Sequence, residues 1–297
     1  MRRLLIVALT VLVPLGLSAA AADTFAKIDS LHDQGKYAEA SALALEAVSA
    51  ASPVEKAELY WRAAREALEL GDEAEDRKES KDAILKHFDE GEKYADMAIA
   101  ANPQNNLGYY WKSSNIGRSG QVKGILNSLA KAKPMRELLV KDLSLDANHP
   151  DAYFVLGQLY RELTTAGPLS FGDIDAAVSL GRRAVDARVQ AVQSGTEKEL
   201  SYAYYLELAK SLWKRNLTAA KRTSSQAKLQ AAWQAAKTPL EKGSAYEAAL
   251  TLKASSDREE ARELVNWMIA ELSSKASRTK GQDTDLADAR ETLAEWK

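Results

Sequence analysis

Cysteine is absent from all 297 residues of the sequence. Its absence excludes disulfide bonds, thiolate metal sites, a cysteine nucleophile and a lipid-modified N-terminal cysteine. Histidine is nearly absent, since only His32, His87 and His149 occur. No two of them are spaced to share a helical face, so we expect no metal site. The fold must therefore be stabilised by packing alone.

Long apolar runs are also missing, except at the N-terminus. Arg2 and Arg3 precede the apolar residues 4–17, and a small-residue A-x-A pattern ends at Ala22. This pattern predicts a secretory signal peptide over residues 1–22. The run falls short of the roughly 20 residues that span a bilayer, with an uncleaved anchor as the alternative. Cleavage would leave residues 23–297 as an exported, periplasmic protein without stable membrane insertion.

An excess of basic charge is missing too. Without Arg2 and Arg3 the chain keeps 38 basic and 42 acidic residues, a net charge of −4. Binding to the nucleic-acid backbone needs a basic surface, so we expect no nucleic-acid partner.

Proline and strand-like alternation are scarce, which indicates an all-α protein. The clearest repeating unit covers residues 150–187. In it, Gly157 is followed by Tyr160, and Ala177 by Ala184. The small residues let paired helices approach closely, and the tyrosine fills the space between repeats. An inserted segment lengthens the turn, where Asp173 is expected to cap the second helix.

Similar units precede and follow this one. We expect the first over 23–53, the second over 58–103, the third over 107–150, the fifth over 202–239 and the sixth over 243–274. A charged insertion is expected to extend the helices of the second unit. The third should contain helices 108–118 and 134–147, separated by a connector over 123–133. A capping helix is expected over 284–296.

With these motifs the sequence resembles the tetratricopeptide repeat (TPR) superfamily over nearly all of residues 23–297. The resemblance implies a single domain, a compact and curved α-solenoid of about five to six helix-turn-helix repeats with a C-terminal capping helix. It also implies a concave groove that binds a protein or peptide partner. Chaperone-tail binding is not expected, because Phe154 and Gln158 occupy two positions that would need lysine and asparagine.

A narrower resemblance lies within residues 107–187. Trp111, Gly117, Gly120 and the Asn148-His149-Pro150 turn are similar to the regulator of microtubule dynamics family. Bacterial relatives of that family include the TPR-containing accessory protein of TRAP transporters. This resemblance implies a curved body that holds a partner or a small ligand in its concavity. Those transport proteins carry a lipid-attachment cysteine, which this chain lacks.

The segment GYYWKSSNIGRSGQ, residues 108–121, raises the question of a nucleotide site. Its glycines match neither the P-loop nor the dinucleotide spacing, so we interpret Gly117 and Gly120 as a helix end. No nucleophile elbow occurs, and the acidic run 72–82 is interleaved with basic residues as on a solvated helix. Its expected helical ion pairs are Glu73 with Arg77 and Lys78 with Asp82. We expect no enzymatic activity, no catalytic residues and no cofactor.

The aromatic residues of this segment are candidates for a binding surface. Consecutive helical residues are about 100 degrees apart, so Tyr109, Tyr110 and Trp111 cannot all face one ligand. One or two should lie in the core, and Tyr110 or Trp111 should face the groove. The remaining groove candidates follow from the TPR resemblance, which assigns partner contacts to positions 2, 5, 9, 12 and 13 of a first helix: Asp151, Phe154, Gln158, Arg161 and Glu162. Phe154 can equally pack against the next repeat.

The sequence therefore predicts an exported, non-enzymatic scaffold that binds a protein or peptide in its concave groove, within a cell-envelope assembly. The alternative is an accessory component of a TRAP-like solute transport system. Such a component would contact a solute-binding protein or hold a small hydrophobic ligand.

Overall fold

The computed structural model describes residues 18–167 and 170–296, and over these residues the chain is all helical, without a strand. The first half contains α1 (Ala19–Asp33), α2 (Tyr37–Ala47), η1 (Val48–Ala50), α3 (Pro53–Asp76), α4 (Lys81–Ala101), α5 (Asn106–Lys123) and α6 (Ile125–Leu145). The second half contains α7 (Pro150–Glu162), η2 (Leu163–Thr165), α8 (Ile174–Gln193), α9 (Tyr202–Arg215), α10 (Ala219–Ala235), α11 (Pro239–Ser244), η3 (Tyr246–Ala249), α12 (Asp257–Ser274) and α13 (Lys280–Glu295).

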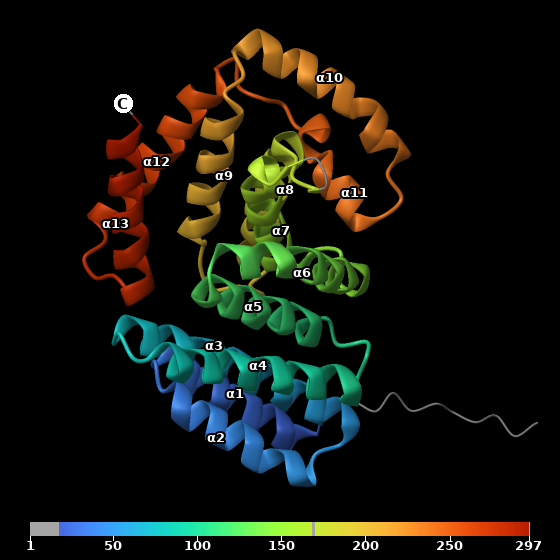
Figure 1. Ribbon diagram of the computed structural model, residues 1–297, viewed down its shortest axis with the longest axis vertical. Coiled ribbons are helices and arrows are strands. Elements are labelled where there is room, and N and C mark those ends of the chain that lie inside the picture. The colour runs from blue at the N-terminus through green and yellow to red at the C-terminus, as the bar shows by residue number, and fades with distance from the viewer. Residues whose placement is uncertain (1–17, 168–169, 297) are drawn as a thin grey trace, which may run out of the picture.

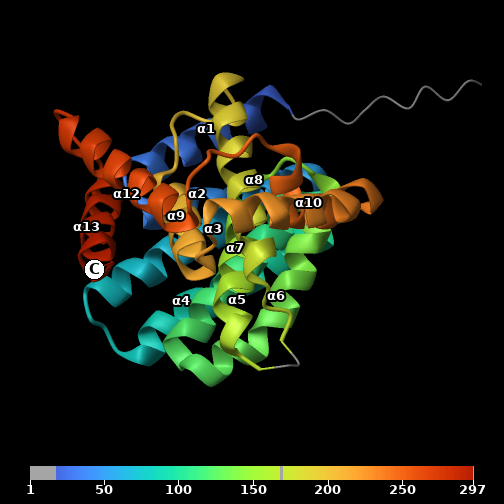
Figure 2. The same cartoon turned by 90° about the horizontal axis from the view of Figure 1, so that it is seen from above.

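The helices form helix-turn-helix pairs that stack into a curved body. Each of the pairs α1/α2, α3/α4, α5/α6 and α7/α8 packs helix against helix (Figures 1 and 2). The first helices of neighbouring repeats also touch, as α1 contacts α3, α3 contacts α5 and α7 contacts α9. We call the side that α1, α3, α5, α7 and α9 share the concave face. The predicted α-solenoid is confirmed.

The first two repeats agree with the sequence. Gly35 has a φ of +72° in the turn after α1, where an L side chain would be strained. Ser52 caps α3 with a capping box, and Ser80 caps α4. Helix α3 has 24 residues and α4 has 21, so the charged insertion extends both helices as predicted. Arg77 pairs with Glu73 at 3.4 Å, but Lys78 lies in the turn with φ +56°, so Lys78 and Asp82 do not share a helix.

The third repeat differs from its prediction. Residues 125–133 are not a connector but the first turns of α6, which runs through Pro134. Gly117 and Gly120 do not end α5, because the helix continues to Lys123 and stops at Gly124, with φ +103°. The two glycines instead allow close packing: a Cβ on Gly117 would lie 2.7 Å from Met135 Cε. A glycine-rich stretch can serve helix contact as well as helix termination, and the sequence alone does not distinguish the two.

The fourth repeat is confirmed in detail. Pro150 starts α7, and Asp173 caps α8 by accepting hydrogen bonds from the amides of Asp175 and Ala176. Gly157 lies against α8, because a Cβ there would meet Ala177 O at 3.5 Å.

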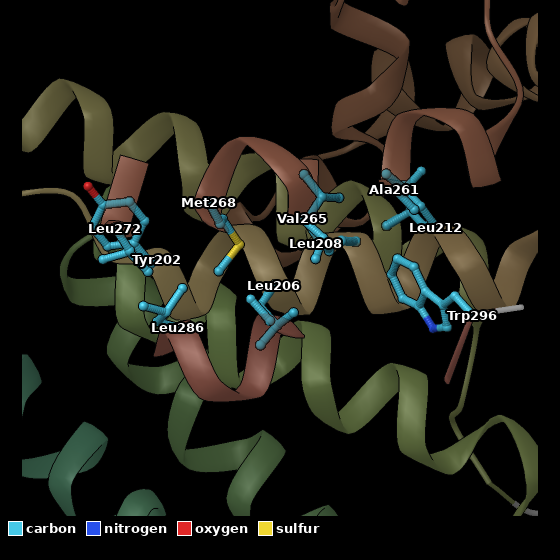
Figure 3. Packing of buried hydrophobic residues seen from close by; sticks show 13 residues of the cluster. Tyr202, Leu206, Leu208, Leu212, Ala261, Val265, Met268, Leu272, Leu286 and Trp296 are labelled. Carbon is cyan, nitrogen blue, oxygen red and sulfur yellow. The ribbon is translucent and has the colours of Figure 1, made fainter. Parts of the chain in front are cut away.

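The last part of the chain departs from regular pairing. Helix α10 packs against η3 and α11, and α12 takes the place beside α9. The reason is that α10 has no apolar stripe, since Arg222 is its only buried residue. Helices α9, α12 and α13 share an apolar core that includes Leu212, Val265 and Met268, with α13 closing the end (Figure 3). A terminal capping helix is thus present.

The predicted signal peptide falls mostly on residues 1–17, outside the described residues. The expected cleavage site after Ala22 lies within the first turns of α1, whose N-cap is Ser18. Ser18 also donates hydrogen bonds to Glu55 of α3 through its amide and its hydroxyl. In the part of the chain that the structure describes, no helix has the length and apolar character to cross a membrane.

Candidate functional site

The concave face contains a cluster of aromatic and ionised side chains from the N-terminal parts of α5, α7 and α9. Tyr110 of α5 makes edge contacts with the rings of Trp111 and His149, each with centroids 4.9 Å apart. Phe154 of α7 stacks on Tyr204 of α9 at 4.7 Å, and the Tyr204 hydroxyl donates a hydrogen bond to Asp151. Phe154 therefore contacts the next repeat. The three repeats contribute side chains to one cluster.

His149, in the turn before α7, lies between two carboxylates. Its Nδ1 is 2.6 Å from Asp142 Oδ2 and its Nε2 is 3.5 Å from Asp151 Oδ2. Burial alone would lower the pKa of His149, but the hydrogen bonds and charges of Asp142 and Asp151 raise it to about 10. The imidazole is therefore a cation at neutral pH. Asn106 donates a hydrogen bond of 2.8 Å to Asp142, which fixes the second side of that carboxylate.

Burial shifts the pKa values of three ionisable side chains around this cluster. Burial raises the pKa of the Tyr110 hydroxyl well above its usual value, and the charge of Asp151 adds to the effect. Burial also raises the pKa of the Glu69 and Glu197 carboxyls, although Glu197 keeps 34% of its side chain exposed. Burial thus disfavours the charged forms of these three groups.

A cavity of about 520 Å³ lies between α5, α6 and α7. Gln158, Arg161 and Glu162 lie on its wall. Its apolar lining consists of Leu129, Ala132, Met135, Val155, Leu159 and Leu163. Arg161 binds Glu207 through two nitrogens, one of them at 2.8 Å, and also pairs with Glu162 at 2.8 Å.

The seven candidates from the sequence thus fall into two neighbouring places. Tyr110, Trp111, Asp151 and Phe154 belong to the aromatic cluster, with the Trp111 Nε1 buried and without a hydrogen-bond partner among the described residues. Gln158, Arg161 and Glu162 belong to the cavity. Helix α7 links the two, because residues 151, 154, 158 and 161 recur at helical spacing along one side.

The structure adds residues that the sequence did not single out. His149 is a buried ion rather than a plain turn residue, and Tyr204 joins the cluster from the next repeat. Leu129 and Leu159 line the cavity. No pattern in the sequence indicates this ion pair, because the spacing of Asp142 and His149 across a repeat boundary matches no known motif. Over residues 18–167 and 170–296, no group of histidine and carboxylate side chains is arranged to hold a metal ion.

Comparison with known proteins finds one matching family model and a similar solved structure. A family model described as "Regulator of microtubule dynamics protein 1-3" matches residues 24–169. The chain is similar to a thermophilic TPR protein from Thermus thermophilus, at 15% identity and a TM-score of 0.47, covering 77% of this chain and 100% of that one. No curated protein matches the sequence. The helix pairs show that the described residues form an all-α helical-repeat architecture, and the family match is confined to residues 24–169.

Proposed function

We propose that this protein is an exported, non-enzymatic scaffold that binds a protein or peptide partner on its concave face, within a cell-envelope assembly. The observation that carries the proposal is the side of α7 from Asp151 to Glu162, which joins the aromatic cluster to the cavity. It offers an aromatic ring, an amide and charges of both signs in one line. The proposal of export rests on residues 1–22 of the sequence.

The chemistry of His149 supports a binding role over a catalytic one. A general base must be neutral near the working pH and must reach a substrate proton. His149 has both ring nitrogens facing carboxylates and a pKa of about 10, so it is protonated and engaged at neutral pH. The buried charge serves to connect the third repeat to the fourth.

Affinity capture from cell-envelope extracts with paired variants tests this function. The variant Gln158→Ala/Glu162→Ala alters the concave face, whereas Glu46→Ala alters an exposed residue of α2. A protein that wild type and Glu46→Ala capture, and that Gln158→Ala/Glu162→Ala loses, supports the proposal. A partner captured equally by all three proteins places binding elsewhere and contradicts it.

The second candidate function is a TRAP-like transport accessory that contacts a solute-binding protein or holds a small hydrophobic ligand. The cavity favours this candidate, because its volume of about 520 Å³ and its largely apolar lining are typical of sites that bind small molecules. Native mass spectrometry of the purified protein would then show a bound small molecule that Leu159→Gln releases. A spectrum with the mass of the polypeptide alone would remove this candidate.

A further inference from the structure

Ion pairs connect the two ends of the helical array. Lys280 of α13 pairs with Asp76 of α3 at 2.7 Å, and Lys198, in the segment between α8 and α9, pairs with Asp33 of α1. The paired residues are 204 and 165 positions apart in the sequence. More than half of each of these four side chains is exposed. We call the place where the two ends meet the seam.

Apolar packing does not reach across the seam among the described residues. The core cluster at the N-terminal end is confined to residues 21–94, and the cluster at the C-terminal end begins at Val178. Outside the junction of α6 and α7, the two ion pairs are the only hydrogen bonds or ion pairs that join residues 18–147 to residues 150–167 and 170–296. Exposed ion pairs contribute little free energy, and salt screens them. The seam is therefore held weakly.

The helices on each side of the seam pack continuously. On one side, α2 packs against α3, α3 against α4 and α4 against α5. On the other side, α7 packs against α8, α8 against α9 and α9 against α12. We call residues 18–147 the N-terminal body, and residues 150–167 and 170–296 the C-terminal body. Each body is held together far more firmly than the seam.

The two bodies are joined most closely at the junction of α6 and α7. Leu139 and Leu143 of α6 pack with Tyr153 and Leu156 of α7 in one core cluster. Beside this packed contact lies the cavity of about 520 Å³, and α5 contacts α7 little. Rotation about the α6–α7 contact would change the width of the cavity without breaking the core of either body.

Polar contacts keep the same junction together. His149 Nδ1 lies 2.6 Å from Asp142 Oδ2, and Arg136 Nε of α6 donates a hydrogen bond of 3.0 Å to the Tyr160 hydroxyl of α7. The turn 146–149 between α6 and α7 is also the covalent link between the two bodies. Domain motions commonly turn about a few residues at the ends of elements. The α6–α7 junction thus has the features of a hinge.

We propose that the protein opens and closes as a clamp, with its hinge at the α6–α7 junction and its latch at the two ion pairs of the seam. Opening moves α1 and α3 away from α9 and so widens the concave face between them. The inference goes beyond the proposed function, because the clamp can open whether or not a partner binds α7.

Distances between spin labels test the proposal with the full chain. The sequence lacks cysteine, so labels can be placed on Ala38→Cys of α2 and Ala287→Cys of α13, both at exposed positions. We expect the distance between these labels to shift to longer values as NaCl rises from about 0.05 M to about 1 M. The control pairs Ala38→Cys/Ala100→Cys and Gln193→Cys/Ala287→Cys each lie within one body, so their distances should stay constant.

Charge removal tests the latch separately from the hinge. In Asp33→Asn/Asp76→Asn the labels at residues 38 and 287 should be far apart already at low salt, and the response to salt should be lost. The matched control Asp96→Asn/Glu263→Gln removes the same number of charges from exposed ion pairs that each lie within one body. This control should respond to salt like wild type.

Three outcomes would overturn the proposal. An unchanged distance between residues 38 and 287 in high salt and in Asp33→Asn/Asp76→Asn would show that the array is rigid. Equal lengthening in the control label pairs would show a general loosening of the repeats. An equal effect of Asp96→Asn/Glu263→Gln would show that the seam pairs are not the latch.

The proposed function can fail independently of the clamp. If the labels separate as expected but no partner requires Gln158 and Glu162, the clamp stands and the proposed function is wrong. If such a partner is captured while the labels keep a fixed distance, only the clamp is wrong.

Discussion

Single residues hold the first three repeats together through contacts that tolerate little change. Asn115 of α5 is fully buried and donates hydrogen bonds to the carbonyls of Ala64, at 3.1 Å, and Trp111, at 2.8 Å. Its amide lies directly against Gly91 of α4, where a Cβ would be 2.0 Å from Asn115 Oδ1. Helices α3, α4 and α5 therefore meet at one asparagine and one glycine.

This contact predicts the effect of Gly91→Ala. The methyl group would displace the Asn115 amide and break its buried hydrogen bonds. The free energy of unfolding should therefore fall by about 2 to 4 kcal/mol. Denaturant unfolding measures the change. Gly281→Ala in α13 is the control, because its Cβ would meet only Thr279 Oγ1, at 3.9 Å. This substitution should raise the free energy of unfolding by about 0.5 kcal/mol, because alanine favours a helix more than glycine does. Equal effects of the two substitutions would contradict the account of Gly91.

The ion cluster at His149 predicts a pH dependence of stability. Its folded pKa of about 10 lies above the unfolded value near 6.5. The stabilisation by protonated His149 is therefore full below about pH 6.5 and is lost as the pH rises through 10. His149→Gln leaves Asp142 buried without its cation, so it should destabilise by about 3 kcal/mol at pH 6.

Denaturant unfolding from pH 6 to 10.5 measures this. The difference between wild type and His149→Gln should shrink steadily over that range, because wild type loses the stabilising charge. In His149→Gln/Asp142→Asn both charges of the pair are removed. This double variant should therefore lose less stability at pH 6, relative to wild type, than His149→Gln does. A difference that stays constant up to pH 10.5 would show that His149 is not held as a cation.

At the scale of elements, the C-terminal helices are joined by a buried ionic network instead of regular repeat packing. Three cations and three anions, all at most 8% exposed, make it up: Arg182, Arg215, Arg222, Glu247, Asp257 and Glu260. Each arginine contacts at least two of the acids. The balance of charge lets a helix without an apolar stripe, α10, attach to α12 and η3.

Removing Arg222 should release α10. The substitution Arg222→Met leaves two cations against three buried anions, which should destabilise the protein by about 3 to 5 kcal/mol. Hydrogen exchange of the amides of residues 219–235 should become faster than in wild type. Lys221→Met, at the exposed neighbouring position, should leave exchange unchanged. Protected α10 amides in Arg222→Met would mean that Gln226 and Gln230, which bond to the η3 carbonyls, suffice.

The sequence predicts elements well where apolar spacing and caps agree. Gly157, Tyr160 and Asp173 define the fourth repeat, and all three lie where the motif places them. It fails where one residue type has two uses. Pro134 resembles a helix start but lies inside α6, and Gly117 resembles a helix end but allows contact with Met135. The ionic network joins residues up to 78 positions apart, for which no local pattern exists.

The candidate site was predictable only in part for the same reason. Repeat position identifies the side of α7 that carries Asp151, Phe154, Gln158 and Arg161, because helical spacing is local. The cavity depends on the separation of α5 from α7, and the cluster depends on Tyr204 meeting Asp151 across a repeat boundary. Such contacts between repeats are set by the curvature of the whole array, which no single segment of sequence specifies.

At the scale of the whole molecule, the curvature brings distant parts together. Lys280 of α13 pairs with Asp76 of α3 at 2.7 Å, and Lys198 pairs with Asp33 of α1. Figure 1 shows one end of α13 close to one end of α3. Each of these four side chains is more than half exposed, so the pairs contribute little to stability. Continuous packing from repeat to repeat is what should make residues 23–297 one domain.

We predict that the two halves unfold together. Tryptophans lie in both halves, with Trp61 and Trp111 in the first and Trp213, Trp233, Trp267 and Trp296 in the second. Variants that keep the tryptophans of one half and replace those of the other half with phenylalanine should show the same denaturant midpoint by fluorescence as by circular dichroism. Two separate midpoints would divide the chain into two domains, with the boundary expected between α6 and α7.

We propose that a partner contacts this protein on the concave side of α7. Site-specific photo-crosslinking tests it most directly, with a photoreactive amino acid placed at Gln158 in the cavity or at Glu46 on α2, in cells that express the protein. We expect a crosslinked partner from Gln158 and none from Glu46. A partner crosslinked from Glu46 but not from Gln158 would contradict it.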